Sequence, residues 1–202
     1  MFHTFPPIPR LARDVVVTEK IDGTNASVHI LHENEPFDGP AGILVSGYRI
    51  VAASRTRYIT PEDDNYGFAA WVRDHSETLV EGLGAGSHFG EWWGRGIQRG
   101  YGLSERHFSL FNTARWNHIC PPYCRVVPVL YQGPFDTSLI EAELQYLKRH
   151  GSVAAPGFPN PEGIVVYHTA ARMGFKRTCE RDEQRKSEYQ DPLLGEFLVL
   201  GG

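Results

Sequence analysis

The stretch from Val15 to Asn25 holds the residues best suited to chemistry: a lysine, Lys20, then a carboxylate, Asp22, and then Gly23. β-Branched residues precede and follow this group, which predicts a strand, a tight loop and a returning strand. The glycine lets the loop turn sharply, and the short loop holds the lysine at the strand end. Such a lysine becomes a nucleophile when burial or neighbouring cations lower its pKa. Lys20 is therefore the candidate nucleophile.

Five further patterns follow in order along the chain. Phosphoryl and nucleotidyl transfer depends mostly on positioning and charge neutralisation. It needs cations for phosphate oxygens, carboxylates for a divalent metal and an aromatic face for a base. Each need has a candidate in one of the patterns, which are Ser54-Arg55-Thr56, Phe89-Gly90-Glu91-Trp92-Trp93-Gly94, Phe108-Ser109-Leu110-Phe111-Asn112, Pro161-Glu162-Gly163-Ile164-Val165-Val166 and Phe175-Lys176-Arg177-Thr178.

In this order the six patterns resemble the covalent nucleotidyltransferases, the superfamily of ATP-dependent polynucleotide ligases and capping enzymes. The closest resemblance is to the phage-type ATP-dependent RNA ligases, and it covers roughly residues 15–178. In that family the first lysine attacks the α-phosphate of ATP, expels pyrophosphate and becomes lysyl-AMP. The AMP moves to a 5′-phosphate end, and a 3′-hydroxyl then displaces it. The resemblance also implies RNA repair in a phage or bacterium.

The resemblance implies that Lys20, Asp22 and Lys176 are the catalytic residues. Lys20 is the nucleophile, Lys176 contacts the α-phosphate, and Asp22 is the motif acid, with a metal or ribose contact as its role. Many relatives have two lysines separated by one residue in the last pattern, whereas here Thr178 replaces the second. Arg177 points to the other face of the strand by alternation, so it is a poor substitute.

The resemblance further implies a site for ATP. Arg55 matches an arginine that contacts phosphate and ribose, which suits a guanidinium because it recognises two oxygens at once. Glu91 matches a glutamate that contacts ribose, and Phe111 matches an aromatic residue that stacks on adenine. The expected cofactor is therefore ATP, carried covalently as AMP on Lys20.

Three other residues complete the expected site. Glu162 matches a glutamate tied to the metal and the nucleotide, so Mg²⁺ or Mn²⁺ is the expected metal. Glu19 and Asn25 match positions that flank the nucleophile and shape the adenine and phosphate contacts.

Plain structural interpretations exist for the same residues. Lys20 taken alone would be an exposed strand-end lysine, Arg55 a surface salt-bridge residue and Phe111 a core residue. Glu91 and Glu162 lie beside apolar neighbours in expected strands. A buried carboxylate without a partner is costly, which favours a functional role for both glutamates.

A basic segment follows the pattern that ends at Gly94. Arg95, Arg99 and Arg106 lie close in sequence with Tyr101 between them, which is the best local match to a nucleic-acid contact. A solvated loop is the alternative.

The cysteine-containing segment has another possible role. His118, Cys120 and Cys124 supply three of the four ligands that a tetrahedral zinc site needs. We interpret this segment as a proline-rich loop with incidental cysteines.

Composition limits the classes of protein. The chain has 202 residues and a formal net charge of −4, which suits one domain and gives no global positive field for nucleic acid. Three cysteines argue against a disulfide framework and favour a reducing cytoplasm. We expect no signal peptide, because the N-terminus lacks a basic and then apolar region, and no membrane span.

Alternation and turn signals predict an α+β domain made of antiparallel sheets with few helices. The resemblance implies that this is the ATP-grasp-like adenylation domain of a ligase, and we expect it to cover residues 1–178, followed by a charged tail over 179–202 and no second domain. The expected strand regions are 15–31, 43–51, 88–92, 108–112, 125–131, 162–168 and 172–178.

Two helices are expected. The first covers residues 61–74, where Thr60 would cap the helix and Pro61 would occupy its first position. The second covers residues 138–148, with Ser138 as its cap.

The sequence therefore predicts an ATP-dependent RNA ligase that joins 5′-phosphate and 3′-hydroxyl ends. A DNA or nick-sealing ligase, or an end-adenylyltransferase, is the first alternative. A catalytically idle nucleic-acid-binding relative is the second, although Lys20, Arg55 and both glutamates argue against it. RNA strand ends are the expected partner, with DNA as the alternative, and the oligomeric state stays open.

Overall fold

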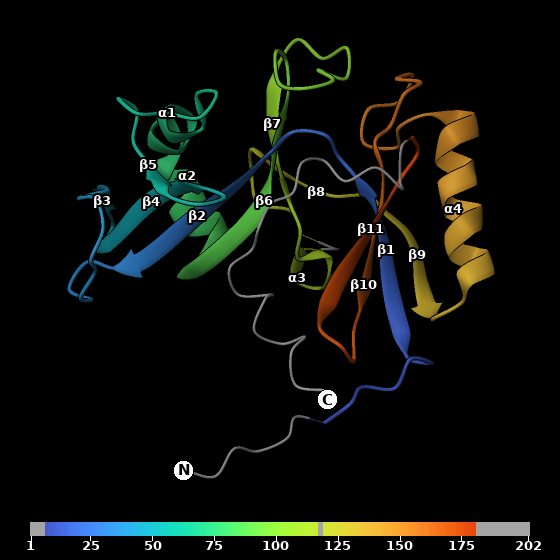
Figure 1. Cartoon of the computed structure of the whole chain (residues 1–202). Coiled ribbons are helices and arrows are strands. Elements are labelled where there is room, and N and C mark those ends of the chain that lie inside the picture. The colour runs from blue at the N-terminus through green and yellow to red at the C-terminus, as the bar shows by residue number, and fades with distance from the viewer. Residues whose placement is uncertain (1–6, 117–118, 181–202) are drawn as a thin grey trace, which may run out of the picture.

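Two β-sheets form the framework of the computed structural model, which describes residues 7–116 and 119–180. The smaller sheet has the strand order β11-β10-β1-β9, and all its pairs are antiparallel. Its strands are β1 (Asp14–Lys20), β9 (Val129–Pro134), β10 (Gly163–His168) and β11 (Met173–Thr178). Figure 1 shows this sheet facing the larger one across the molecule.

The larger sheet has the order β3-β4-β2-β6-β7-β8, and β5 pairs with β4. Its strands are β2 (Thr24–His32), β3 (Ile43–Val45), β4 (Tyr48–Ser54), β5 (Tyr58–Ile59), β6 (Gly86–Gly94), β7 (Arg106–Leu110) and β8 (Cys124–Val126). The pairs are antiparallel except β7 with β8, which is parallel. The α+β, mainly antiparallel prediction is confirmed.

Helices cover the outer faces of both sheets (Figure 1). α4 (Thr137–His150) packs on the smaller sheet, and α1 (Phe68–Asp74) and α2 (Ser76–Leu83) pack on the larger one. The short α3 (Thr113–Trp116) follows β7. None of the helices in the described residues is long and apolar enough to span a membrane.

Alternation along β1 divides its side chains between a core and a cavity. Val15 and Val17 are fully buried in the cluster that also contains Leu144 of α4. Val16 and Thr18 lie on the opposite face and line the cavity between the sheets. The strand thus ends with Lys20 presented toward the cavity.

The chain passes from one sheet to the other immediately after Lys20, because β1 and β2 belong to different sheets. The connection depends on Gly23. A Cβ atom there would lie 2.5 Å from the carbonyl oxygen of Trp92 and 2.7 Å from the Cβ of Trp93. Only glycine allows this approach without displacing the neighbouring strand.

The first predicted helix is placed wrongly. Residues 60–63 form a turn closed by the backbone of Thr60 and Asp63, and α1 begins only at Phe68. Asp64 satisfies the first turn, since its carboxylate accepts hydrogen bonds from the N–H groups of Ala69 and Ala70 at 2.8 and 3.0 Å. The N-cap residue Gly67 has no side chain to do this, so Asp64, which precedes it in the sequence, accepts these hydrogen bonds instead.

Two further predictions need correction. The expected strand 125–131 is two strands in different sheets, β8 and β9, and Pro128 lies between them. α4 begins with Asp136 as its cap instead of Ser138, because the Asp136 carboxylate accepts from the N–H groups of Ser138 and Leu139. Most of the predicted charged tail, from residue 181, lies outside the described residues.

Candidate active site

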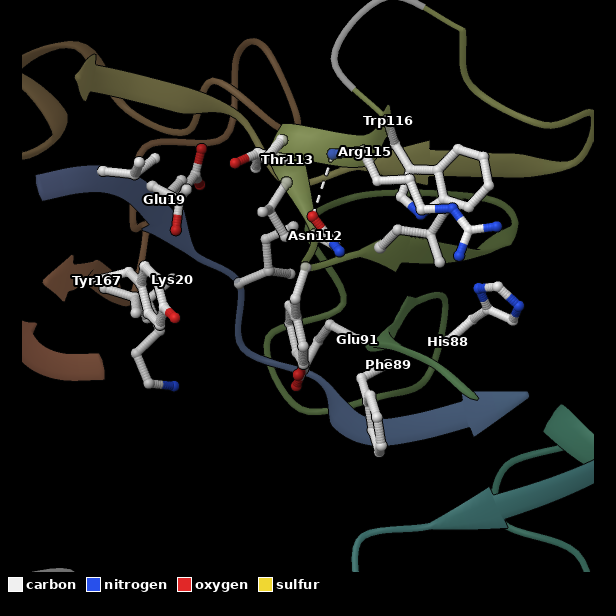
Figure 2. A pocket seen from close by; sticks show the side chains of 18 of the residues that line it. Glu19, Lys20, His88, Phe89, Glu91, Asn112, Thr113, Arg115, Trp116 and Tyr167 are labelled. Carbon is white, nitrogen blue, oxygen red and sulfur yellow. Dashed lines mark hydrogen bonds between the residues drawn. The ribbon is translucent and has the colours of Figure 1, made fainter. Parts of the chain in front are cut away.

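A cavity of about 730 Å³ lies between the two sheets. Lys20 and Tyr167 belong to one wall, while Phe89 and Glu91 belong to the other (Figure 2). Of the residues predicted to form the site, the cavity is lined by Glu19, Lys20, Asn25, Glu91 and Phe111. The structure therefore brings the lysine pattern, the Phe89–Gly94 pattern and the Phe108–Asn112 pattern together at one place, although they are far apart in the sequence.

The Pro161–Val166 pattern joins this group through an ion pair. Lys20 Nζ lies 2.5 Å from Glu162 Oε2. The Lys20 side chain is 25% exposed and the Glu162 side chain only 6% exposed. The pair forms because Lys20 lies opposite Gly163 in the β1–β10 register, which puts Glu162 beside the end of β1. A buried carboxylate therefore holds the amine at the edge of the cavity.

Gly163 explains how the last strand approaches this pair. A Cβ atom on Gly163 would lie 2.1 Å from the carbonyl oxygen of Arg177 and 2.7 Å from the Cα of Thr178. The glycine at that position thus lets β11 pair closely with the start of β10, next to Glu162.

Glu91 connects β6 with the loop between β1 and β2, residues 21–23, which we call the lysine loop. Its carboxylate accepts a hydrogen bond from Asn25 Nδ2 at 2.8 Å and one from the Gly23 N–H at 3.1 Å. Burial raises the pKa of Glu91 to about 7, although Asn25, Lys20 and the Gly23 N–H act to lower it. Near neutral pH the group therefore exists in both protonation states.

The raised pKa of Glu91 predicts a pH dependence of stability. In the unfolded chain the carboxyl group would titrate near 4.5, whereas in the folded chain it titrates near 7. The folded state therefore binds more protons between these values, and the free energy of unfolding falls by about 3 kcal/mol as pH rises through them. We expect Glu91→Gln to remove this fall, as measured by urea unfolding at pH 5 and pH 8. Glu77→Gln, at an exposed position on α2, should leave it unchanged.

Glu19 has a role that its neighbour Lys20 does not share. Its buried carboxylate accepts from the Ser152 hydroxyl at 2.6 Å and from the N–H groups of Val153 and Ala154, both at 2.8 Å. Burial raises the pKa of Glu19, and these three hydrogen bonds oppose that shift. Glu19 thus fastens the end of β1 to the loop after α4, in addition to lining the cavity.

Asp22 and Arg99 form a second ion pair outside the cavity lining. Arg99 Nε lies 2.9 Å from Asp22 Oδ2, and Arg99 Nη1 donates to the Asn160 carbonyl at 3.1 Å. The Asp22 N–H donates to the Tyr101 hydroxyl at 2.7 Å. These contacts hold the lysine loop against the segment that leads to Glu162.

The predicted nucleic-acid segment uses much of its charge within the fold. Arg106 donates to the carbonyl oxygens of Arg95 and Tyr66 at 3.0 and 2.7 Å, in addition to the Arg99 contacts above. Arg95 is exposed. A nucleic-acid contact by these three arginines stays a prediction. Arg99 and Arg106 are exposed, and their guanidinium groups also hydrogen-bond within the fold.

Two of the remaining predicted residues, Arg55 and Lys176, do not line the cavity. Arg55 is exposed in the turn after β4 and does not line the cavity. Lys176 is also exposed, but it lies opposite the cavity-lining Val165 in the β10–β11 register and so shares its face. Arg177 lies on the other face, as predicted, where its Nη2 is 3.3 Å from Glu141 Oε2 of α4.

Some cavity residues were not predicted. Val165 and Tyr167 alternate along β10 on the face toward the cavity, and Phe89 lies two residues before Glu91 on the same face of β6. Alternation from the predicted strands was the signal that could have found all three. Arg115 and Trp116 of α3 also line the cavity, and no local pattern indicated them.

Among the residues that the structure describes, the cysteine segment contains no group of three side chains that could hold a metal ion. His118, the third predicted ligand, lies outside the described residues. Cys120 Sγ donates to the Cys124 carbonyl at 3.1 Å, and burial raises the pKa of the Cys124 thiol to about 12.

The fold is that of a covalent nucleotidyltransferase. The chain belongs to the RNA ligase family, whose family model matches residues 13–185. No curated protein sequence matches the chain.

Solved structures of an RNA ligase from Naegleria gruberi share the fold. A glutamate-to-alanine variant with ATP and Mn has a TM-score of 0.58 and 18% identity, with 88% of this chain and 53% of that chain covered. A lysine-to-methionine variant with AMP and Mn has a TM-score of 0.55 and 17% identity, with 83% and 50% covered. The chain thus spans about half the length of the ligase that it matches.

Proposed function

We propose that this chain is an ATP-dependent RNA ligase that joins 5′-phosphate and 3′-hydroxyl ends through lysyl-AMP formed on Lys20. The observation that carries the proposal is the Lys20–Glu162 pair at the edge of the cavity between the sheets. Family membership supports the class of reaction, and the ATP or AMP with Mn in the similar Naegleria gruberi structures supports the nucleotide and the metal.

In the first step the Lys20 amine attacks the α-phosphorus of ATP. An N–P bond forms, the bond to the bridging oxygen of pyrophosphate breaks, and the amine loses a proton. Glu162 Oε2, 2.5 Å from Nζ, lies where it can accept that proton. In the later steps a 5′-phosphate oxygen displaces the lysine from AMP, and a 3′-hydroxyl then displaces AMP to form the phosphodiester.

The cavity residues fit a nucleotide. Phe111 is partly exposed in the cavity and offers an aromatic face, and Val165 lines the wall of the opposite sheet. The Glu91 carboxylate lies on the larger sheet, where it can accept from ribose hydroxyls. Lys176 shares the face of Val165 and supplies a cation for the α-phosphate.

A divalent cation also fits the donor set. Magnesium is commonly bound by one or two carboxylates together with substrate phosphates and water, so it needs no dedicated protein cage. Glu162 is the carboxylate that would hold it, beside Lys20. When bound, the ion would neutralise charge on the triphosphate.

An end-joining assay tests the proposal and separates it from its alternatives. With ATP and Mn²⁺, a 5′-phosphorylated RNA with a free 3′-hydroxyl should be joined, and DNA of the same sequence should be joined more slowly. Adenylylated ends without joined product would favour an end-adenylyltransferase, and preferred joining of nicked DNA would favour a DNA ligase. A protein that takes no label from ATP would be the idle relative.

A further inference from the structure

A row of aromatic rings continues from the cavity along the open face of the larger sheet. The rings belong to Phe89, His29, Tyr58 and Phe37, and we call this row the aromatic strip. Neighbouring ring centroids are 6.0, 5.6 and 5.3 Å apart, and each neighbouring pair meets edge to face. The strip begins inside the cavity, because Phe89 is one of the cavity-lining residues.

The strip lies on the face that the helices leave uncovered. The β-strand register puts His29 opposite Ser87, Phe89 opposite Ser27 and Tyr58 opposite Ala53, whereas the intervening Val28 and Ile59 are buried toward α1 and α2. Phe89 is 57% exposed and Tyr58 is 39% exposed. The exposed rings therefore form a continuous surface next to the nucleotide site.

His29 acts in the strip as a neutral ring. Its Nε2 and Nδ1 atoms hydrogen-bond the hydroxyls of Ser27 and Ser87, both at 2.9 Å. Burial lowers the pKa of His29, which favours the uncharged imidazole. The ring is thus suited to stacking and not to holding a phosphate.

Cations flank the strip. The Arg49 guanidinium carbon lies 6.0 Å from the centroid of the Phe37 ring at the far end. Arg55 is exposed in the short turn between β4 and Tyr58, and it has no hydrogen bond or ion pair within the described residues. Flat rings with cations beside them are the arrangement by which proteins hold single-stranded nucleic acid, with rings on the bases and cations on the phosphates.

From this placement we infer that the aromatic strip binds unpaired bases of the RNA strand whose end occupies the cavity. The inference rests on the proposed function and adds that the substrate end is single-stranded. Bases stacked within a duplex do not offer their faces to side chains, so a nicked duplex cannot use the strip. The strip adjoins the cavity through Phe89, so the bases it holds would be those nearest to the reacting end.

The test compares two probes and three variants. The probes are a fluorescent 5′-phosphorylated single-stranded RNA and a nicked RNA duplex, whose binding is measured by fluorescence anisotropy without ATP. We expect Tyr58→Ala to weaken binding of the single strand about tenfold, because stacking on one ring is lost. Tyr58→Phe keeps the ring and should bind as the unchanged protein does. Tyr146→Ala removes a tyrosine that is 45% exposed on α4, away from the strip, and should have no effect.

Labelling of the protein by ATP alone provides the second readout. Tyr58 does not line the cavity, so Tyr58→Ala should keep wild-type labelling, which also shows that the variant is folded. The inference is overturned if Tyr58→Ala binds the single strand as tightly as the wild type does, or if the nicked duplex binds as tightly as the single strand and Tyr58→Ala weakens both equally. It is also overturned if a wild-type protein that takes label from ATP binds no single-stranded RNA. Absence of label on the wild type would instead contradict the proposed function.

Discussion

Lys20→Ala is expected to abolish both covalent labelling by ATP and joining of RNA ends. The amine of Lys20 is the nucleophile of the proposed first step, and it projects from the end of β1 into the cavity. Among the described residues, no other lysine lines this cavity. Removal of an attacking group leaves only background reaction, so the loss should be on the order of 10⁴-fold or more. Gel separation of the denatured protein after reaction with labelled ATP measures it.

Two companion variants separate the loss of the nucleophile from other effects. Lys20→Arg keeps a cation next to Glu162 but is not deprotonated in proteins, so it should fold normally and take no label. Lys148→Ala removes an exposed lysine of α4 and should be labelled normally. Appreciable label on Lys20→Ala would mean that another group is the nucleophile.

Glu162→Gln is expected to reduce labelling about 100-fold or more while the protein remains folded. The variant keeps the size of the side chain, but it loses the negative charge that holds Lys20 Nζ at 2.5 Å. A misplaced nucleophile alone can cost on the order of 100-fold, and the proposed proton acceptor and metal ligand is lost as well. The initial rate of label incorporation at saturating ATP is the measurement.

Position and charge can be told apart at this residue. Glu162→Asp retains the charge but shortens the side chain, so it should recover part of the activity that Glu162→Gln loses. Glu143→Gln on α4 provides a matched change on the outer side of the smaller sheet and should have no effect. Wild-type rates for Glu162→Gln would remove this residue from the mechanism.

The parts of the site that could be predicted were those encoded locally. β-Branched runs on both sides of Lys20 indicated β1 and β2, and Gly23 indicated the tight connection between them. The prediction that the second strand returns beside the first was wrong, because β1 and β2 belong to different sheets. Strand alternation correctly sent Arg177 to the face opposite Lys176. These signals need only neighbouring residues, which is why they were readable.

What could not be predicted depends on contacts between distant segments. The Glu19 carboxylate is satisfied by a loop that begins 133 residues later, and Arg99 reaches Asp22 across 77 residues. No periodicity reports such contacts. Likewise, the assignment of residues 125–131 to one strand failed because Pro128 lies where the chain changes sheets, and β-propensity is similar on both sides of it.

The central claim is that Lys20 carries AMP during the reaction. Tandem mass spectrometry of peptides from the protein, after incubation with ATP and Mn²⁺ but without RNA, tests it most directly. One adenylyl group should be found on the peptide that contains Lys20, attached through Nζ, and it should disappear when 5′-phosphorylated single-stranded RNA is added. An adenylyl group on another residue, or an unmodified Lys20 in folded protein that still joins RNA, would contradict the account.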